Sequence, residues 1–325
     1  MGRNVMGKNG RQLLCVIAGA AIIAPLCVSA QGWMPPGPDK RCPSKWGVAD
    51  VRGAANMMTP DAVMKATRLI RQGQVYELGK VLEPAIPKFG LRTWSMNTQR
   101  TAGPGGRNQQ IGNEEVVTTE LGQVGTQFDA LPHIGIGEDL YNCNKNAAIA
   151  TRNGFTKLGV ENVGALMSRG VLLDIAALKG VDILPADYEV TVSDLEAAIQ
   201  KQGTPVGKAD IVLVRTGWGR HYVTNNATFN SGQPGIGVSA AEWLAAREIM
   251  LVGSDNWGIE VFPNPDKDLR FPVHQIMLTV NGIYQIENLD LEGLSRDKAY
   301  EFAFVVQPLK IKGGTGSTVA PIAIR

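Results

Sequence analysis

The chain contains few of the residues that carry catalysis at neutral pH. Its 325 residues include only three histidines and four cysteines, and its formal net charge is +2. So small a charge gives no electrostatic reason to expect nucleic acid or an acidic membrane surface as a partner. The sequence has no GxSxG element, Walker sequence or dinucleotide fingerprint, so a serine-hydrolase elbow and the common phosphate-binding loops are not supported. The positions of the few histidines therefore become informative.

The overall composition is that of a globular protein. Hydrophobic residues make up 44% of the chain and charged residues 19%, and 38 glycines and 18 prolines indicate many tight turns. Short apolar runs typical of buried strands alternate with amphipathic segments typical of helices. We therefore expect a single α/β domain with a mixed sheet. Helices are predicted over 59–72, 190–203 and 239–249, the last capped by Ser239, and strands over 75–79, 170–176, 210–217 and 282–289. The Gly-rich, polar segment 101–113 is predicted to be a mobile loop over the site.

The N-terminus has the pattern of a secretory signal peptide. Three basic residues within the first eleven positions precede an apolar stretch over residues 13–28, which ends in small residues. A membrane anchor is the alternative, but the uninterrupted apolar part is shorter than the roughly 20 residues that span a bilayer. We expect residues 1–30 to be removed, leaving residues 31–325 as a periplasmic or secreted domain without a stable membrane anchor.

Removal of the signal peptide would leave Cys42 and Cys143 as the only cysteines. Two thiols in an oxidising compartment can pair, and this pair would tie the Pro-rich N-terminal arm to the middle of the chain. Two separate free thiols are the alternative, and the sequence leaves both open.

Polar residues with metal-ligand chemistry gather in the run QVGTQFDALPH, from Gln123 to His133, and again downstream. The residues concerned are Gln123, Gln127, Asp129 and His133 in the run, and His274 and Glu287 beyond it. Oxygen donors combined with imidazole suit Mn²⁺ or Zn²⁺ rather than a thiolate site.

The run resembles the motif H-x-G-T-H-x-D-x-P-x-H of the cyclase or kynurenine formamidase family of metal-dependent hydrolases. Aligned on Gly125, the two leading histidines of the motif fall on Gln123 and Gln127, its Asp on Asp129 and its last His on His133. A branch of the family is similar, with GTQ-x-D in place of GTH-x-D, and the chain is identified as a member of that branch. Further blocks carry the resemblance over most of the mature chain: 45–60, 168–174, 210–218, 234–244 and 253–260.

The resemblance implies a swivelling β/β/α fold, a homo-oligomer and one divalent metal ion, Mn or Zn. The implied metal ligands are Gln123, Gln127, Asp129, His274 and Glu287, with His133 as the proton shuttle. Because two imidazoles of the motif are amides here, the identity and affinity of the metal are open. Each residue also has a structural alternative: a turn-forming carboxylate for Asp129, a helix histidine bonded to a carbonyl for His274, an exposed edge strand for Glu287 and a structural role for His133.

The proposed ligands suggest residues that could contact a small-molecule substrate. Phe128 is flanked by two of them, and Trp218 and His221 follow a predicted strand end, where ligand sites of α/β proteins often gather. For the aromatic residues, which include Trp94 and Trp257, a place in the core is the alternative. For His221 the alternative is a surface loop.

The function expected from these residues is metal-dependent hydrolysis. Attack of metal-bound hydroxide on a carbonyl would open a cyclic or amide C–N or C–O bond, with His133 moving the proton. Small aromatic amides, lactones and lactams are the expected substrates. The alternatives are a lactonase or dehydratase of the same fold, or a metal-free periplasmic protein that only binds a small ligand.

Overall fold

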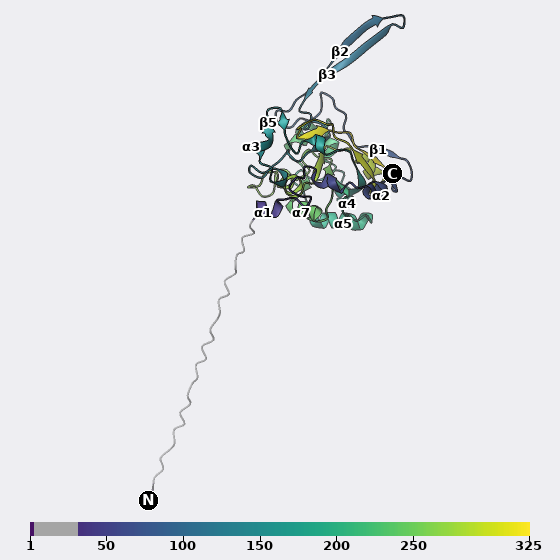
Figure 1. Ribbon diagram of the computed structural model, residues 1–325. Helices are drawn as coiled ribbons and strands as arrows, with labels where there is room; N and C mark the ends of the chain where they lie inside the picture. Colours follow the sequence, from purple (N-terminus) through teal and green to yellow (C-terminus); the bar gives the residue numbers. More distant parts are fainter. Residues whose placement is uncertain (3–31) are drawn as a thin grey trace. The chain divides into compact units, whose positions relative to one another are not determined.

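A mixed sheet of nine strands organises the chain (Figure 1). Its order is β1 (Val75–Glu77), β15 (Ile322–Ile324), β13 (Glu301–Val306), β7 (Leu166–Asp174), β9 (Ile211–Arg215), β11 (Leu251–Ser254), β12 (Tyr284–Glu287), β4 (Gln127–Asp129) and β14 (Gly316–Thr318). The four central strands β7, β9, β11 and β12 are parallel, and the strands on either side of them are antiparallel. Strand β9 is buried at every position, as its apolar run predicts for a strand covered on both faces, and β11 and β12 are buried at every position as well.

The computed structural model describes residues 1–2 and 32–325, and Trp33–Arg325 form one unit. The predicted signal peptide lies outside the described residues. Among those that are described, no helix is long and apolar enough to cross a bilayer. The prediction of one α/β domain with a mixed sheet is confirmed.

Helices flank the sheet and connect its strands. They are α1 (Pro38–Arg41), α2 (Pro60–Thr67), α3 (Asn146–Ile149), α4 (Ile175–Lys179), α5 (Val192–Gln202), α6 (Asn226–Ser231), α7 (Val238–Ala246), α8 (Pro272–His274) and α9 (Glu292–Arg296). Thr59 caps α2, and Thr191 forms a capping box on α5. Ser239 is no cap, because α7 already begins at Val238 after Gly237. Helix α8 runs directly into a π-helical turn, Gln275–Val280, a geometry often found at functional sites.

The segment predicted as a loop over the site is a long β-hairpin instead. Strands β2 (Trp94–Gly105) and β3 (Gln110–Thr119) pair in antiparallel register, and nearly all of their residues are exposed (Figure 1). The pairing satisfies the backbone of a polar segment that the sequence marks only by its glycines. Two short sheets complete the structure, β8 (Glu189–Val190) with β10 (Gly235–Ile236) and β5 (Ala150–Thr151) with β6 (Gly154–Phe155).

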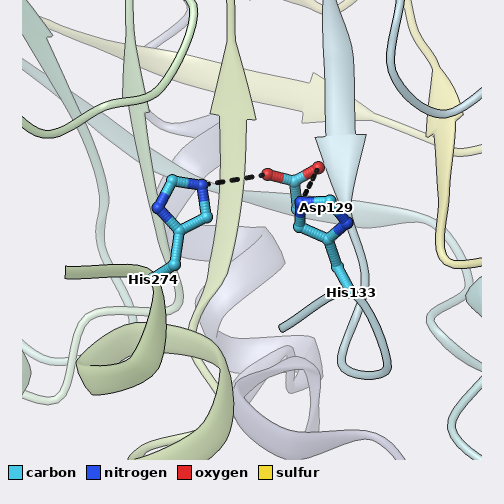
Figure 2. Close-up of side chains that lie close together, drawn as sticks. All are labelled: Asp129, His133 and His274. Atoms are coloured by element: carbon cyan, nitrogen blue, oxygen red, sulfur yellow. Dashed lines mark ion pairs between the residues drawn. The ribbon is translucent and has the colours of Figure 1, made fainter. Parts of the chain in front are cut away.

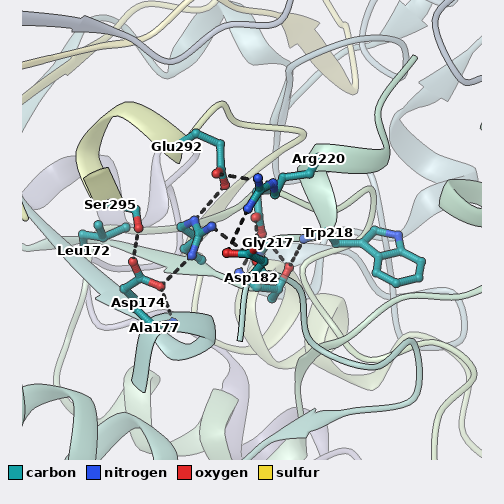
Figure 3. A network of polar contacts seen from close by, with 12 residues as sticks. Leu172, Asp174, Ala177, Asp182, Gly217, Trp218, Arg220, Glu292 and Ser295 are labelled. Carbon is teal, nitrogen blue, oxygen red and sulfur yellow. Dashed lines mark hydrogen bonds and ion pairs between the residues drawn. The ribbon is translucent and has the colours of Figure 1, made fainter. Parts of the chain in front are cut away.

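A network of ion pairs and hydrogen bonds that includes Asp174, Glu292 and Ser295 holds the carboxyl ends of β7 and β9 (Figure 3). Arg215 Nη1 lies 2.9 Å from Asp174 Oδ1 in a buried pair, and its Nε lies 2.8 Å from Oε1 of the partly exposed Glu292 at the start of α9. Ser295 donates a hydrogen bond to Asp174. Breaking a buried ion pair leaves an uncompensated charge, which costs about 3–5 kcal/mol. This network therefore ties the ends of β7 and β9 to the start of α9.

Cys42 and Cys143 form a disulfide, with their Cα atoms 5.9 Å apart and a sequence separation of 101. Of the two alternatives that the sequence leaves open, pairing is the one found. The bond ties the N-terminal arm to the chain that follows β4.

The size of the closed loop leads to a stability prediction. The variant Cys42→Ser/Cys143→Ser is expected to lose about 2–5 kcal/mol of unfolding free energy, because an uncrosslinked unfolded chain has more conformational freedom. Urea denaturation monitored by circular dichroism measures the loss. Wild-type protein treated with reductant should match the variant, and an unchanged midpoint in both would contradict the prediction.

Candidate metal centre

The site is built where strand β4 pairs with strand β12. In this antiparallel register Asp129 stands opposite Gln285, and Gln127 stands opposite Glu287. Because side chains alternate along a strand, these four residues share one face of the sheet. Strand β12 lies inside the sheet and Glu287 is 3% exposed, so the edge-strand alternative for Glu287 is excluded.

A tight turn before β4 brings Gln123 to the same face. Gly125 has φ of +72°, and a Cβ atom at this position would lie 2.3 Å from the Leu82 side chain. Only glycine meets both conditions without strain. Asn288 holds the turn by donating from Nδ2 to the carbonyl oxygen of Gly125 and by accepting from Thr126 Oγ1 at its own carbonyl oxygen.

Asp129 lies between two imidazoles (Figure 2). Its Oδ2 atom is 3.9 Å from His274 Nε2, and its Oδ1 atom is 4.0 Å from His133 Nε2. One ligand atom from each of the three residues lies within 4.8 Å of the others. Asp129 Oδ2 is buried and has no hydrogen-bond partner among the described residues. A carboxylate oxygen in that position is costly unless a cation or a donor faces it.

Two buried carboxylates hold His274. Its Nδ1 lies 2.6 Å from Glu260 Oε1, and its Nε2 lies 3.2 Å from Glu287 Oε1. The backbone N–H groups of Val273 and His274 also donate to Glu260, so this carboxylate is fixed at the start of α8. A carboxylate on Nδ1 directs the lone pair of Nε2 toward a metal, which is the usual arrangement of a ligating histidine.

The buried acids outnumber the buried cations. Asp129, Glu260 and Glu287 are each at most 3% exposed. Burial together with repulsion from Asp129 raises the pKa of Glu287 to about 8. Burial opposes the charged form of His274, but hydrogen bonds to Glu260 and Glu287 outweigh it and raise its pKa to about 10. Both shifts favour the protonated forms, as expected where negative charge is in excess. A divalent cation would balance this excess.

His133 differs from His274 in its surroundings. It is partly exposed on one side, and burial lowers its pKa, opposed by the charge of Asp129. The imidazole of His133 is therefore neutral at neutral pH, whereas the two carboxylates around His274 favour its cationic form in the absence of metal.

The two glutamines use their amides in hydrogen bonds within the site. Gln123 Nε2 donates to Asp129 Oδ1 at 3.2 Å, and Gln123 Oε1 accepts from Arg92 Nη2 at 3.0 Å. Gln127 Nε2 donates to Glu287 Oε2 at 2.5 Å. Gln123 thus turns an N–H group toward Asp129 and its oxygen toward Arg92, an orientation unlike that of an oxygen ligand. No hydrogen bond to Gln127 Oε1 occurs among residues 32–325, so that oxygen can still serve as a ligand.

These residues meet the requirements of a divalent metal. Carboxylates at 129 and 287 and the imidazole at 274 supply the hard and borderline donors that Mn²⁺ and Zn²⁺ take. The unpartnered Asp129 Oδ2 faces the same space. Of the five expected ligands, Asp129, His274 and Glu287 lie together, with Gln127 beside them. The amide of Gln123 is instead hydrogen-bonded to Arg92 and Asp129.

An aromatic cavity of about 160 Å³ opens beside these residues. Phe89 stacks on Trp257 with ring centroids 4.3 Å apart, and Phe271 contacts His274 edge-on at 5.4 Å. The lining residues are Phe89, Arg92, Gln123, His133, Ile134, Trp257, Gly258, Phe271, His274 and Glu287. An apolar cavity of about 150 Å³ accommodates one benzene ring, so this cavity has room for a single-ring aromatic group.

The three residues expected to contact substrate do not line this cavity. Phe128 is fully buried on the opposite face of β4, where its ring packs on Tyr284 at 5.0 Å. Trp218 is also buried, and its Nε1 donates to the carbonyl oxygen of Phe229. His221 lies edge-on to Trp218 at 4.9 Å. Phe128 points away from the site because successive side chains of a strand point to opposite faces of the sheet, and its neighbours Gln127 and Asp129 face the site.

Several residues of the site were not anticipated from the sequence. Glu260 ends the block 253–260, which resembles the family. A charged residue next to apolar neighbours was the only indication in the sequence that Glu260 could belong to the site. Arg92 and Phe271 had no such signal. Gln285 shares the face of Asp129, and both polar atoms of its amide are buried without a partner in the described part of the chain. Only the pairing of β4 with β12 reveals this last position.

Comparisons with known proteins show a family and a shared fold. Residues 76–261 match the family model named Cyclase. A crystal structure described as a novel cyclase is 35% identical, with a TM-score of 0.82 over 90% of this chain and 100% of that one. The isatin hydrolase of Roseibium aggregatum is 26% identical over 62% of this chain and 70% of its own length. Isatin hydrolase A from Ralstonia solanacearum shares the fold, with 24% identity and a TM-score of 0.57 over 78% of this chain and 92% of its own.

The contact between Glu260 and His274 leads to a prediction about metal affinity. Glu260→Gln removes the charge that orients His274, and loss of such a partner typically weakens metal binding about 10–100-fold. Isothermal titration of the metal-free protein with Zn²⁺ measures the change. The control is Glu301→Gln, which removes an exposed carboxylate paired with Arg169. Equal affinities in the two variants would show that Glu260 does not support the ligand.

Proposed function

This chain belongs to the cyclase family, and we propose that it is a metal-dependent hydrolase that opens a cyclic or amide C–N or C–O bond beside a carbonyl group. One observation carries the proposal: two buried carboxylates, Asp129 and Glu287, meet the oriented imidazole of His274 at the end of an aromatic cavity. The similarity to isatin hydrolase supports a hydrolase. We further propose that this hydrolase is an amidase or a lactonase.

Asp129, His274 and Glu287 would hold the metal, with Gln127 as a further oxygen donor. When bound, a divalent ion would polarise the substrate carbonyl and lower the pKa of a water molecule toward about 7. The protein contributes the orientation of the ligands: Glu260 holds His274, and the sheet register holds the two carboxylates. Mn²⁺ and Zn²⁺ both suit this donor set, and we propose one of them.

His133 would contact the reacting atoms of the substrate directly. It lines the cavity, and its Nε2 faces the same space as Asp129 Oδ1. A neutral imidazole there can hold or move a proton at the reacting oxygen or at the leaving group. His133 would thus handle the proton, and Asp129, His274 and Glu287 would bind the metal.

The cavity suggests the substrate class. Its aromatic walls, Phe89, Trp257 and Phe271, favour a flat ring, and its volume of about 160 Å³ suits one ring rather than several. Arg92 at the lining can bind the carboxylate that ring opening or amide cleavage releases. We therefore propose small aromatic lactams, lactones or amides as substrates.

We also propose that the protein acts in the periplasm or is secreted. The disulfide between Cys42 and Cys143 supports this location, because such bonds persist in oxidising compartments. The predicted signal peptide and homo-oligomer stay predictions.

The activity is tested on purified protein with isatin, an aryl formamide and an aryl lactone. We expect about one equivalent of Mn or Zn by elemental analysis, hydrolysis of at least one of these compounds, and loss of activity with EDTA that the same metal restores. A metal-free protein that binds one of these compounds without turning it over would instead indicate the small-ligand-binding alternative.

Separate roles for the metal ligands and His133 are tested by substitution. Asp129→Ala and Glu287→Ala are expected to lose the bound metal. His133→Ala is expected to keep the metal and to lose about 10²–10⁴-fold in kcat, the range typical of a general acid–base group. Metal content and kcat are measured on the same samples. Loss of metal in His133→Ala would make His133 a ligand, and an unchanged kcat would remove it from the reaction.

A further inference from the structure

We infer that Arg92 acts through Gln123 as a positioning residue that fixes the tautomer of His133, so that His133 presents an N–H group at Nε2. The inference rests on the proposed function, which assigns His133 to proton handling, and it specifies the form in which the residue works. It follows from which atoms can donate hydrogen bonds and which can only accept them.

The amide of Gln123 can be oriented in only one way. A guanidinium group has donors and no acceptor, so the atom that faces Arg92 Nη2 at 3.0 Å has to be the amide oxygen. An ionised carboxylate only accepts, so the atom that faces Asp129 Oδ1 at 3.2 Å has to be the amide nitrogen. Both neighbours require the same orientation, and a flipped amide would fail with both.

This orientation determines the protonation of His133. Gln123 Nε2 also lies 3.2 Å from His133 Nδ1. Because an amide nitrogen is only a donor, Nδ1 has to accept with its lone pair and carries no proton. A neutral imidazole has one N–H group, which is therefore at Nε2. All the hydrogen-bonding groups of the Gln123 amide are then used: the oxygen accepts from Arg92 and, at 3.4 Å, from Gln127 Nε2, and one N–H donates to each of Asp129 and His133.

The two histidines of the site thus have opposite forms. His274 faces Glu260 with Nδ1, so with a metal bound it would keep its N–H at Nδ1 and offer the lone pair of Nε2 to the metal. For His133 to bind through Nε2, its proton would have to move to Nδ1, where it would face the N–H group of Gln123. Two donors would then oppose each other at 3.2 Å. The cluster of Asp129, His133 and His274 therefore divides into two metal ligands and one hydrogen-bond donor.

The role of His133 becomes more specific as a result. From Nε2 it can donate a hydrogen bond to the substrate oxygen on which negative charge develops. It can also give this proton to the leaving group, after which the proton lost by the attacking water restores the Nε2–H form. A neutral donor in this position needs no change of protonation before the reaction begins.

Nuclear magnetic resonance tests the tautomer without measuring activity. In protein with ¹⁵N-labelled histidine, long-range ¹H–¹⁵N correlations distinguish the Nε2–H form from the Nδ1–H form. The chain has only three histidines, and His221→Gln and His133→Gln assign their signals. We expect His133 to be the Nε2–H form in metal-free and zinc-loaded protein. Zinc should shift the Nε2 signal of His274 and leave the nitrogens of His133 nearly unchanged.

Three variants test whether Arg92 and Gln123 set the tautomer. Arg92→Met removes the shorter of the two hydrogen bonds to the amide oxygen, leaves only the 3.4 Å contact with Gln127 Nε2, and is expected to give His133 a mixed population of both forms. Arg92→Lys keeps a donor-only group and is expected to restore the Nε2–H form. Gln123→Glu replaces the N–H donor by an acceptor and is expected to move the proton to Nδ1. The control is Arg100→Met, which removes an exposed arginine from the β2 strand and should leave the spectrum of His133 unchanged.

Two results in the wild-type protein would overturn the inference, and neither depends on the variants. One is an Nδ1–H form of His133, and the other is a zinc-induced shift of its Nε2 signal. A mixed population that Arg92→Met does not alter would remove Arg92 from the arrangement. These readouts stay distinct from failure of the proposed function, because a protein that hydrolyses no test compound still reports the tautomer of His133.

Discussion

The antiparallel pairing of β4 with β12 is the constraint on which the site depends. It sets Asp129 opposite Gln285 and Gln127 opposite Glu287, and it turns all four side chains to one face. A slip of one residue would send this polar set into the core and bring Phe128 and Ile286 to the site. The register is held because Phe128 packs on Tyr284 in the core, so burial of apolar residues on one face positions the polar residues on the other.

Charge determines the rest of the arrangement. Burying Asp129, Glu260 and Glu287 within one small region is unfavourable unless cations or donors compensate. Glu260 is compensated by two backbone N–H groups and by His274, and Gln123 and Gln127 donate to the other two carboxylates. Amides at positions 123 and 127 suit this task because each amide nitrogen has two uncharged N–H donors, whereas a neutral imidazole has one.

Much of the fold could be predicted from the sequence, because it follows from local patterns. The buried strands β7 and β9 contain apolar runs, and the capping residues Thr59 and Thr191 lie at helix starts. The hairpin β2–β3 was missed because its strands are polar on both faces and lack the period that burial imposes. Ser239 had the right chemistry for a cap, but the chain had already entered the helix one residue earlier.

The sequence by itself determined the list of reactive groups and their family resemblance: an Asp, a Glu, two histidines and two glutamines in recognisable runs. Only the tertiary structure decided what each group does. Glu260 and Arg92 reach the site from segments far from the motif, and their contacts determine which nitrogen of each histidine can carry a proton. Hydrogen-bond direction depends on the partner that faces an atom in space, and no spacing along the chain contains that information.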